Sequence, residues 1–142
     1  MFKIEIDGKP RRFIGMGCVN KYAISGREFL ENKVFCVPEN KKGNAEEYSL
    51  SRCIVTDERV KAFYDKKGNC PPPKCFTVGE HKERGKVLVF GYGLTDGNFN
   101  SFTKSFLCVL ANEQGEIKIT PIYYENIIFE EKQKEKKENA ND

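Results

Sequence analysis

Residues 87–90 read Val-Leu-Val-Phe, and residues 106–111 read Phe-Leu-Cys-Val-Leu-Ala. Neither run alternates apolar with polar residues, which is typical of strands that are buried on both faces. A short polar link, Asn112 to Gly115, joins the second run to residues 116–120, where apolar and polar residues alternate again. This order predicts a β-hairpin at the centre of a sheet, with residues 127–129 as the strand that closes it.

The N-terminus predicts another hairpin. Phe2, Ile4 and Ile6 alternate with charged residues, as in a half-buried strand. Asp7-Gly8 follows and is a strong signal for a two-residue turn, so residues 11–16 are expected to return as the partner strand. Pro10 favours a sheet edge or a strand start, because proline cannot donate a hydrogen bond to a neighbouring strand.

The middle of the chain is less regular. We expect a second strand pair at residues 22–25 and 33–37, followed by a polar, turn-rich loop at residues 38–47. A single short helix is predicted over residues 57–64, with Thr56 as its N-cap and Gly68-Asn69 at its end.

The fold class predicted from these elements is mainly β, a β-rich α+β domain. Its sheet is antiparallel and partly closed, or forms a small barrel, and one short helix accompanies it. A sandwich, an SH3-like barrel and an OB-like barrel remain open as alternatives. The length of 142 residues suits one domain, which we place at residues 1–129. Residues 130–142 are charged and lack apolar periodicity, which predicts a disordered tail.

Composition limits the function. Charged residues make up 32% of the chain, yet the net charge is only +3, so an anionic partner is permitted but not required. The N-terminus does not have the pattern of a signal peptide, and the apolar runs are too short to span a bilayer. We therefore expect a cytoplasmic protein that contacts no membrane. Its six cysteines are then expected to be mostly reduced, with Cys36 and Cys108 behaving as small buried hydrophobes.

Cys70 and Cys75, with His81 shortly after, form the most conspicuous group of metal-ligating residues. A structural zinc site is one interpretation. The three prolines between the cysteines remove N–H donors that usually support zinc thiolates, and a second Cys-x-x-Cys pair is missing. A redox-active pair beside Lys74 is a weaker alternative. We therefore expect neither a metal nor another cofactor.

The segment from Gly91 to Phe102 is the candidate ligand site. It is interpreted as a long loop after a buried strand, and long ordered loops are disproportionately functional. Glycine backbone and small polar side chains could cradle a phosphate, and its aromatic rings could stack on a base. Packing of those rings under a plain connection is the alternative. The candidate ligand-binding residues in it are Gly91, Tyr92, Gly93, Thr95, Gly97, Asn98 and Phe99.

Basic residues occur in two clusters, at residues 9–12 and 82–86. Arg11 and Arg12 of the first cluster complete the set of candidate ligand-binding residues, since they could contact an anionic group. Ordinary solvated charges at strand ends are the alternative. The sequence alone does not show that this cluster meets the glycine-rich segment.

No catalytic motif occurs, and the chain has a single histidine, so we expect a binding protein rather than an enzyme. The leading hypothesis is a regulatory or accessory protein that holds a small anionic, nucleotide-like molecule. The second is a protein that binds single-stranded nucleic acid with aromatic residues on a sheet face. The third is a protein–protein adaptor or inhibitor. Homo-oligomerisation is left open.

Overall fold

Two antiparallel sheets share a hydrophobic core in the computed structural model, which describes residues 2–39, 43–96 and 102–129. A second, smaller core is formed by residues of the C-terminal sheet alone. The N-terminal sheet has the strand order β4-β3-β2-β1-β5 and contains β1 (Lys3–Ile6), β2 (Lys9–Tyr22), β3 (Glu28–Pro38), β4 (Glu46–Ser49) and β5 (Cys53–Val55). The C-terminal sheet has the order β10-β6-β7-β8-β9 and contains β6 (Thr77–His81), β7 (Gly85–Asp96), β8 (Phe102–Ala111), β9 (Ile117–Tyr123) and β10 (Ile127–Phe129). The predicted class, an antiparallel β-rich fold with one short helix, is confirmed.

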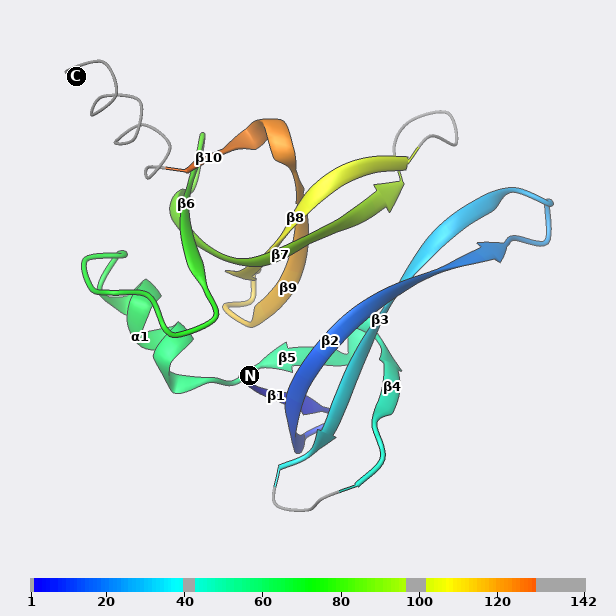
Figure 1. The fold of residues 1–142 in the computed structure, drawn as a ribbon, viewed down its shortest axis with the longest axis horizontal. Helices are drawn as coiled ribbons and strands as arrows, with labels where there is room; N and C mark the ends of the chain where they lie inside the picture. The colour runs from blue at the N-terminus through cyan, green and yellow to red at the C-terminus, as the bar shows by residue number, and fades with distance from the viewer. Residues whose placement is uncertain (1, 40–42, 97–101, 130–142) are drawn as a thin grey trace, which may run out of the picture.

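The C-terminal sheet is curled. Strands β9 and β10 lie at its opposite edges, but only the short 3₁₀ turn Tyr124–Asn126 separates them in sequence. Three residues reach roughly 10 Å when fully extended, so the two edges must approach each other. Figure 1 shows the resulting half-barrel, which β10 completes by pairing with β6. The prediction that residues 127–129 close the sheet is therefore confirmed.

Both predicted hairpins are present. Asp7 and Gly8 have φ angles of 52° and 79°, the left-handed conformation that a tight turn between β1 and β2 requires. Pro10 pairs only with Glu5 of β1, at the start of β2 and before β2 meets β3, so its missing N–H breaks no bond to β3. Strands β8 and β9 form the second hairpin around residues 112–115.

Several boundaries differ from those predicted. Residues 23–25 belong to the turn that follows β2, and not to a strand. The predicted loop at 38–47 is shorter, because β3 runs to Pro38 and β4 begins at Glu46. The sequence also did not predict β4, β5 and β6. These strands have three to five residues, too few for alternation to be recognised, and pairing with longer neighbours stabilises them.

The predicted helix is α1 (Glu58–Asp65). Its N-cap is Asp57 and not Thr56, because the Asp57 carboxylate accepts the N–H of Arg59 at 3.0 Å. The helix ends at Asp65, and Lys67 has a left-handed φ of 54°, which directs the N–H of Gly68 to the Phe63 carbonyl at 2.9 Å. No helix within residues 2–39, 43–96 and 102–129 is long and apolar enough to cross a membrane.

Two polar contacts hold α1 to both sheets. The buried Asp57 carboxylate also accepts the backbone N–H of Lys3 in β1 and two bonds from the Arg59 guanidinium. At the other end, the Tyr64 hydroxyl accepts the N–H of Leu88 and donates to the carbonyl of Val109, and so bridges β7 and β8. Burial raises the pKa of this hydroxyl to about 12.

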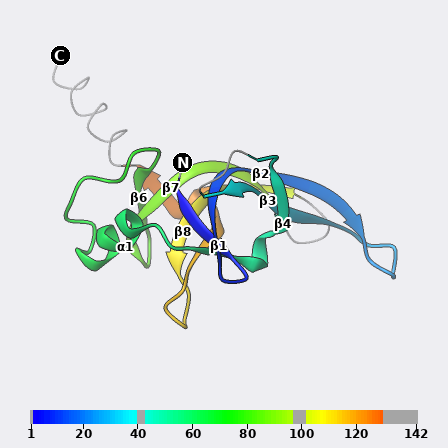
Figure 2. The ribbon, with the colours of Figure 1, turned by 90° about the horizontal axis from the view of Figure 1, so that it is seen from below.

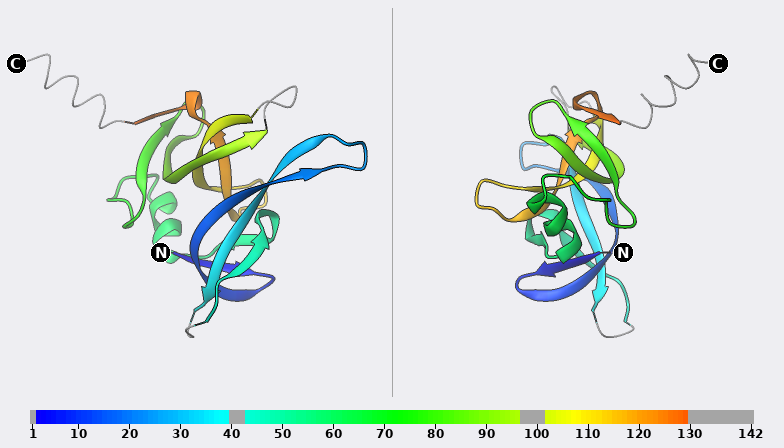
Figure 3. Two further views of the ribbon diagram at one scale, coloured as in Figure 1. Left: turned by 45° about the vertical axis from the view of Figure 1, so that its right-hand side comes forward. Right: turned by 90° about the vertical axis from the view of Figure 1, so that its left-hand side faces the viewer.

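Four phenylalanines join the two sheets. Phe2 and Phe13 belong to the N-terminal half and are stacked with ring centroids 4.4 Å apart. Phe90 of β7 contacts them edge-on at 5.4 Å and 5.3 Å, and Phe76 lies 5.3 Å from Phe2. We call Phe2, Phe13, Phe76 and Phe90 the phenylalanine cluster. Figure 3 shows the two sheets and α1, whose buried Phe63 belongs to the same core.

The Asp57 contacts predict a pH dependence of stability. Burial acts to raise the pKa of Asp57, but hydrogen bonds from the Arg59 side chain and from the N–H groups of Lys3 and Arg59 bring it below its usual value. A carboxyl with a lowered pKa stabilises the fold above its unfolded-state pKa of about 4 and loses that contribution as the pH falls below it. Asp57→Ala should cost about 0.5–2 kcal/mol in the free energy of unfolding at pH 7, and the difference from wild type should shrink below pH ~4.

Urea unfolding at a series of pH values measures this difference. Asp65→Asn removes the same charge from the exposed end of α1 and controls for net charge. A cost for Asp57→Ala that stays constant from pH 7 to well below pH ~4 would show that the charge of Asp57 does not stabilise the fold.

Candidate functional site

Residues 91–96 of the glycine-rich segment are not a loop, so this part of the prediction is wrong. Residues 91–96 continue β7, and Gly91 and Gly93 pair with Leu107 and Ser105 of β8. Both glycines therefore lie within a strand, and not in the loop that was expected to cradle a phosphate. Thr95 also lies in β7, opposite Thr103. Gly97, Asn98 and Phe99 lie outside the described residues.

A β-bulge at Phe90 decides where Tyr92 points. The pairing of β7 with β8 shifts by one residue between Val89 and Gly91, which leaves Phe90 as the extra residue. Phe90 enters the phenylalanine cluster, and Tyr92 pairs with Phe106 on the opposite face of the sheet. Without the bulge, the alternation of side chains would turn Tyr92 toward the other sheet. Tyr92 is instead 81% exposed.

Tyr92 lies at a cavity of about 310 Å³, which we call the aromatic cavity. Phe106 and Phe129 form one wall of the aromatic cavity, and their rings meet edge to face with centroids 5.0 Å apart. Thr77 and Cys75 supply its polar side chains. The residues around the aromatic cavity are Cys75, Thr77, Val89, Phe90, Gly91, Tyr92, Phe106 and Phe129.

The two candidate arginines have different surroundings. Arg11 lies on the inner side of the N-terminal sheet, where its Nε is 3.0 Å from Oε1 of Glu46 and both atoms are buried. Arg12 points the other way and is exposed, at a second cavity of about 290 Å³ that also contains Lys3 and Arg59. We call this the arginine cavity; its other residues are Phe2, Asp57 and Glu58. Arg12 is therefore placed to meet a ligand, and Arg11 is not.

The structure brings the Arg12 segment and the Tyr92 segment together. Phe13 follows Arg12, Phe90 lies two residues before Tyr92, and these two rings are in contact. Phe2 of the arginine cavity and Phe90 of the aromatic cavity are also in contact, with ring centroids 5.4 Å apart. The pKa of the Arg59 guanidinium is raised chiefly by its hydrogen bond to Asp57, with a smaller contribution from Cys75. A cationic cavity thus lies next to an aromatic one.

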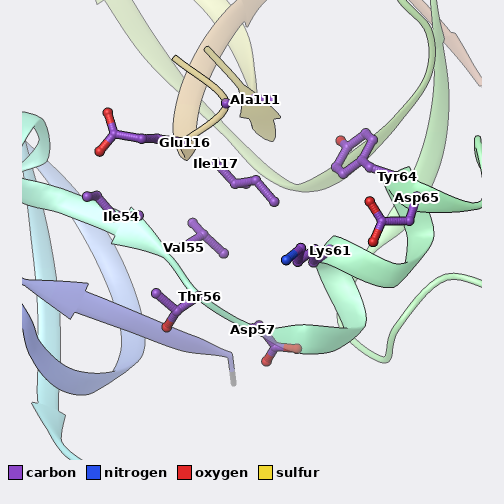
Figure 4. A pocket seen from close by; sticks show the side chains of 11 residues that line it. Ile54, Val55, Thr56, Asp57, Lys61, Tyr64, Asp65, Ala111, Glu116 and Ile117 are labelled. Atoms are coloured by element: carbon purple, nitrogen blue, oxygen red, sulfur yellow. The ribbon is translucent and has the colours of Figure 1, made fainter. Parts of the chain in front are cut away.

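A third cavity, which we call the acidic cavity, has a different character. It has a volume of about 420 Å³ and lies between β5, α1 and the β8–β9 hairpin. Figure 4 shows Val55, Lys61 and Ile117 around it. Three carboxylates, those of Asp57, Asp65 and Glu116, surround it, against the single amine of Lys61. This excess of negative charge would repel an anionic ligand, so the acidic cavity does not suit the expected partner.

The second basic cluster lies at a polar cavity of about 300 Å³, formed by the turn after β6 and by β9. There, Nδ1 of His81 accepts the backbone N–H groups of Glu83 and Arg84 at 3.1 Å and 3.2 Å. This contact occupies the Nδ1 lone pair of the histidine. No group of three metal-ligating side chains occurs within residues 2–39, 43–96 and 102–129.

The cysteines form no disulfide. Cys36 and Cys108 are fully buried, as predicted from their apolar neighbours. Burial raises the pKa of Cys108 to about 12, as it does that of Cys53. Such thiols remain protonated and unreactive near neutral pH.

Sequence reasoning missed Phe106, Phe129, Lys3 and Arg59 as site residues. Their positions in the sequence show only strand and helix signals. Closure of the curled sheet by β10 brings Phe106 and Phe129 together, and hydrogen bonds to Asp57 bring Lys3 and Arg59 together. The glycines inside the apolar run of β7 were the one local signal of this site, since a glycine in the interior of a strand often marks a bulge.

The chain matches no protein-family model, no curated protein and no solved structure in the three comparisons.

The packing of β10, the strand that carries Phe129, depends on Gly79 of the neighbouring strand β6. A methyl group added to Gly79 would lie 2.5 Å from Cγ2 of Ile127, whereas one added to Gly93 would meet Leu107 at an ordinary 3.6 Å. Gly79→Ala should therefore lower the free energy of unfolding by about 1–3 kcal/mol through overpacking. Gly93→Ala should change it by less than about 1 kcal/mol. Denaturant unfolding of both variants makes the comparison, and equal effects would contradict this packing of β10.

Proposed function

We propose that this protein binds single-stranded nucleic acid, with a base in the aromatic cavity and the phosphate backbone along the arginine cavity. The observation that carries the proposal is the solvent-exposed ring of Tyr92, held beside Phe106 on an open sheet face. An exposed aromatic ring on a sheet is the platform on which single-stranded nucleic acids stack their bases, at about 1–3 kcal/mol per base.

The charges support an anionic strand of modest affinity. Arg12 has no acidic partner opposite it in β1 or β3, where it pairs with Lys3 and Val37. Nζ of Lys3 is 3.4 Å from Oε1 of Glu39, and Nη2 of Arg59 is 2.9 Å from Oδ2 of Asp57. These carboxylates partly neutralise the two cations. Few phosphate contacts are therefore available, which agrees with a net charge of only +3.

The shape of the aromatic cavity favours a nucleic-acid strand over a free nucleotide. Pockets for small molecules bury most of the ligand, whereas Tyr92 is 81% exposed and the aromatic cavity is shallow enough to leave it so. A polymer gains affinity from several weak contacts and does not need enclosure. The few polar side chains of the aromatic cavity, Thr77 and Cys75, would make few hydrogen bonds to base edges. We therefore expect weak sequence preference and no catalysis.

Fluorescence anisotropy with a labelled oligothymidylate of about a dozen nucleotides tests the proposal. Tyr92→Ala should weaken binding roughly 5- to 150-fold, the equivalent of about 1–3 kcal/mol, and leave the thermal midpoint unchanged because the ring is exposed. Arg12→Gln should weaken binding and reduce the slope of log K against log salt by about 0.7. Tyr124→Ala removes another exposed tyrosine, away from the aromatic cavity, and is the control.

Two results would contradict the proposal. One is the absence of binding at low salt. The other is an affinity that Tyr92→Ala leaves unchanged. A nucleoside monophosphate that competes as well as the oligonucleotide would favour the small nucleotide-like ligand instead.

A further inference from the structure

The second basic cluster of the sequence borders a cavity that the proposed function does not use. We call it the polar cavity; it has a volume of about 300 Å³ and lies where the turn 81–84 meets Thr120 and Ile122 of β9 and Asn126. All of these residues belong to the C-terminal sheet or to its turns. Figure 2 shows β6, which leads into the turn, at the opposite end of the molecule from the ribbon that β2 and β3 form.

Hydrogen bonds hold the turn in one arrangement. The N–H of Lys82 donates to the carbonyl of Asn126 at 3.3 Å. The N–H groups of Glu83 and Arg84 both donate to Nδ1 of His81. Because Nδ1 accepts these bonds, the proton of the neutral imidazole lies on Nε2. Nε2 has no hydrogen-bond partner among the described residues, so His81 offers an oriented N–H donor at the polar cavity.

Lys82 and Arg84 supply the positive charge of the polar cavity. Both are exposed, and neither forms a salt bridge with another described residue. In contrast, Lys3 and Arg59 of the arginine cavity each have a carboxylate partner. Glu83 is the single carboxylate among the described residues of the polar cavity, which leaves a net positive charge there.

We propose that the polar cavity binds a phosphate group, with Nε2–H of His81 as the oriented donor and Lys82 and Arg84 as the charged donors. A phosphate carries about two negative charges and three acceptor oxygens, so it can meet these side chains together. A carboxylate has one charge and two oxygens and suits this set less well. The Thr120 hydroxyl is not a further donor, because it already donates to the carbonyl of Lys118 at 3.3 Å.

The polar cavity lies on the same face of the sheet as the aromatic cavity. Thr77, Gly79 and His81 alternate along β6 and so share a face. Thr77 borders the aromatic cavity, and His81 borders the polar cavity. The four residues between them span roughly 13 Å, about the length of four stacked nucleotides at ~3.4 Å each. The phosphate can therefore be a free one or belong to a strand whose base lies at Tyr92. Phosphate binding itself does not require base stacking.

NMR of the His81 ring tests the proposal, because this residue is the only histidine of the chain and gives a single set of ring signals. Inorganic phosphate is added in exchange for chloride, at constant ionic strength and a fixed pH of about 8, where phosphate carries close to two charges. The His81 signals should shift until the site is saturated. Acetate, added in the same way, should leave them in place.

Exposed cations provide matched variants. Arg84→Gln and Lys82→Gln should each weaken phosphate binding at least about threefold, since each removes a charge-assisted hydrogen bond. Lys86→Gln removes the same charge from the same basic cluster and should change the affinity less than about twofold. The Lys86 side chain lies elsewhere, since its Cδ would be 2.7 Å from a methyl group added to Gly68. Equal thermal midpoints show that all three variants fold.

An oligothymidylate without a terminal phosphate identifies the source of the phosphate group. Displacement of inorganic phosphate, with a shift of the His81 signals, assigns the polar cavity to the backbone of a strand. Bound phosphate that stays in place assigns it to a free phosphate. Tyr92→Ala, which tests the proposed function, should leave the affinity for inorganic phosphate unchanged in either case.

Two results overturn the proposal. One is a set of His81 signals that stay in place with phosphate or shift equally with acetate. The other is a phosphate affinity that Arg84→Gln lowers no more than Lys86→Gln does, because the attraction is then only that of the general surface charge.

Discussion

The contact of Phe90 with Phe2 and Phe13 is the interaction on which the rest of the structure depends. It joins the curled C-terminal sheet to the N-terminal sheet, and the centroids of the three rings lie within 5.4 Å of one another. Large buried aromatic rings contribute more to stability than any other side chains of a core. The same contact sets Arg12 and Tyr92 near each other, since each lies one or two residues from a ring of the phenylalanine cluster.

The bulge in β7 places neighbouring aromatic side chains on opposite faces of the sheet. It lets Phe90 point into the core while Tyr92, two residues later, points out beside Phe106. A strand without the bulge would have to bury both rings on one side. Gly91 lies directly between these two rings in sequence. The space beside it is open, since a methyl group at this position would meet no other atom within 4 Å. Bulges next to binding sites commonly re-aim a side chain in this way.

The sequence predicted the elements whose signals are local. Asp7-Gly8 marked the first hairpin, the apolar runs marked β7 and β8, and both were found. It assigned the helix cap to Thr56 and not to Asp57, because both residue types cap helices and the choice depends on the contact with Lys3, which is distant in sequence. It interpreted residues 91–102 as a loop because glycines interrupt the apolar pattern. The aromatic cavity could not be predicted, since Phe129 reaches it only through the closure of the half-barrel by β10.

We propose that the curled sheet presents a base-stacking surface beside a cationic one. NMR spectra of the aromatic side chains, recorded while oligothymidylate is added to the wild-type protein, test it most directly. We predict that the ring resonances of Tyr92, Phe106 and Phe129 shift together, with the Arg12 guanidinium, while those of Tyr124 stay unchanged. Ring resonances that stay in place at saturating oligonucleotide, or shifts confined to the acidic cavity around Lys61, would contradict this proposal.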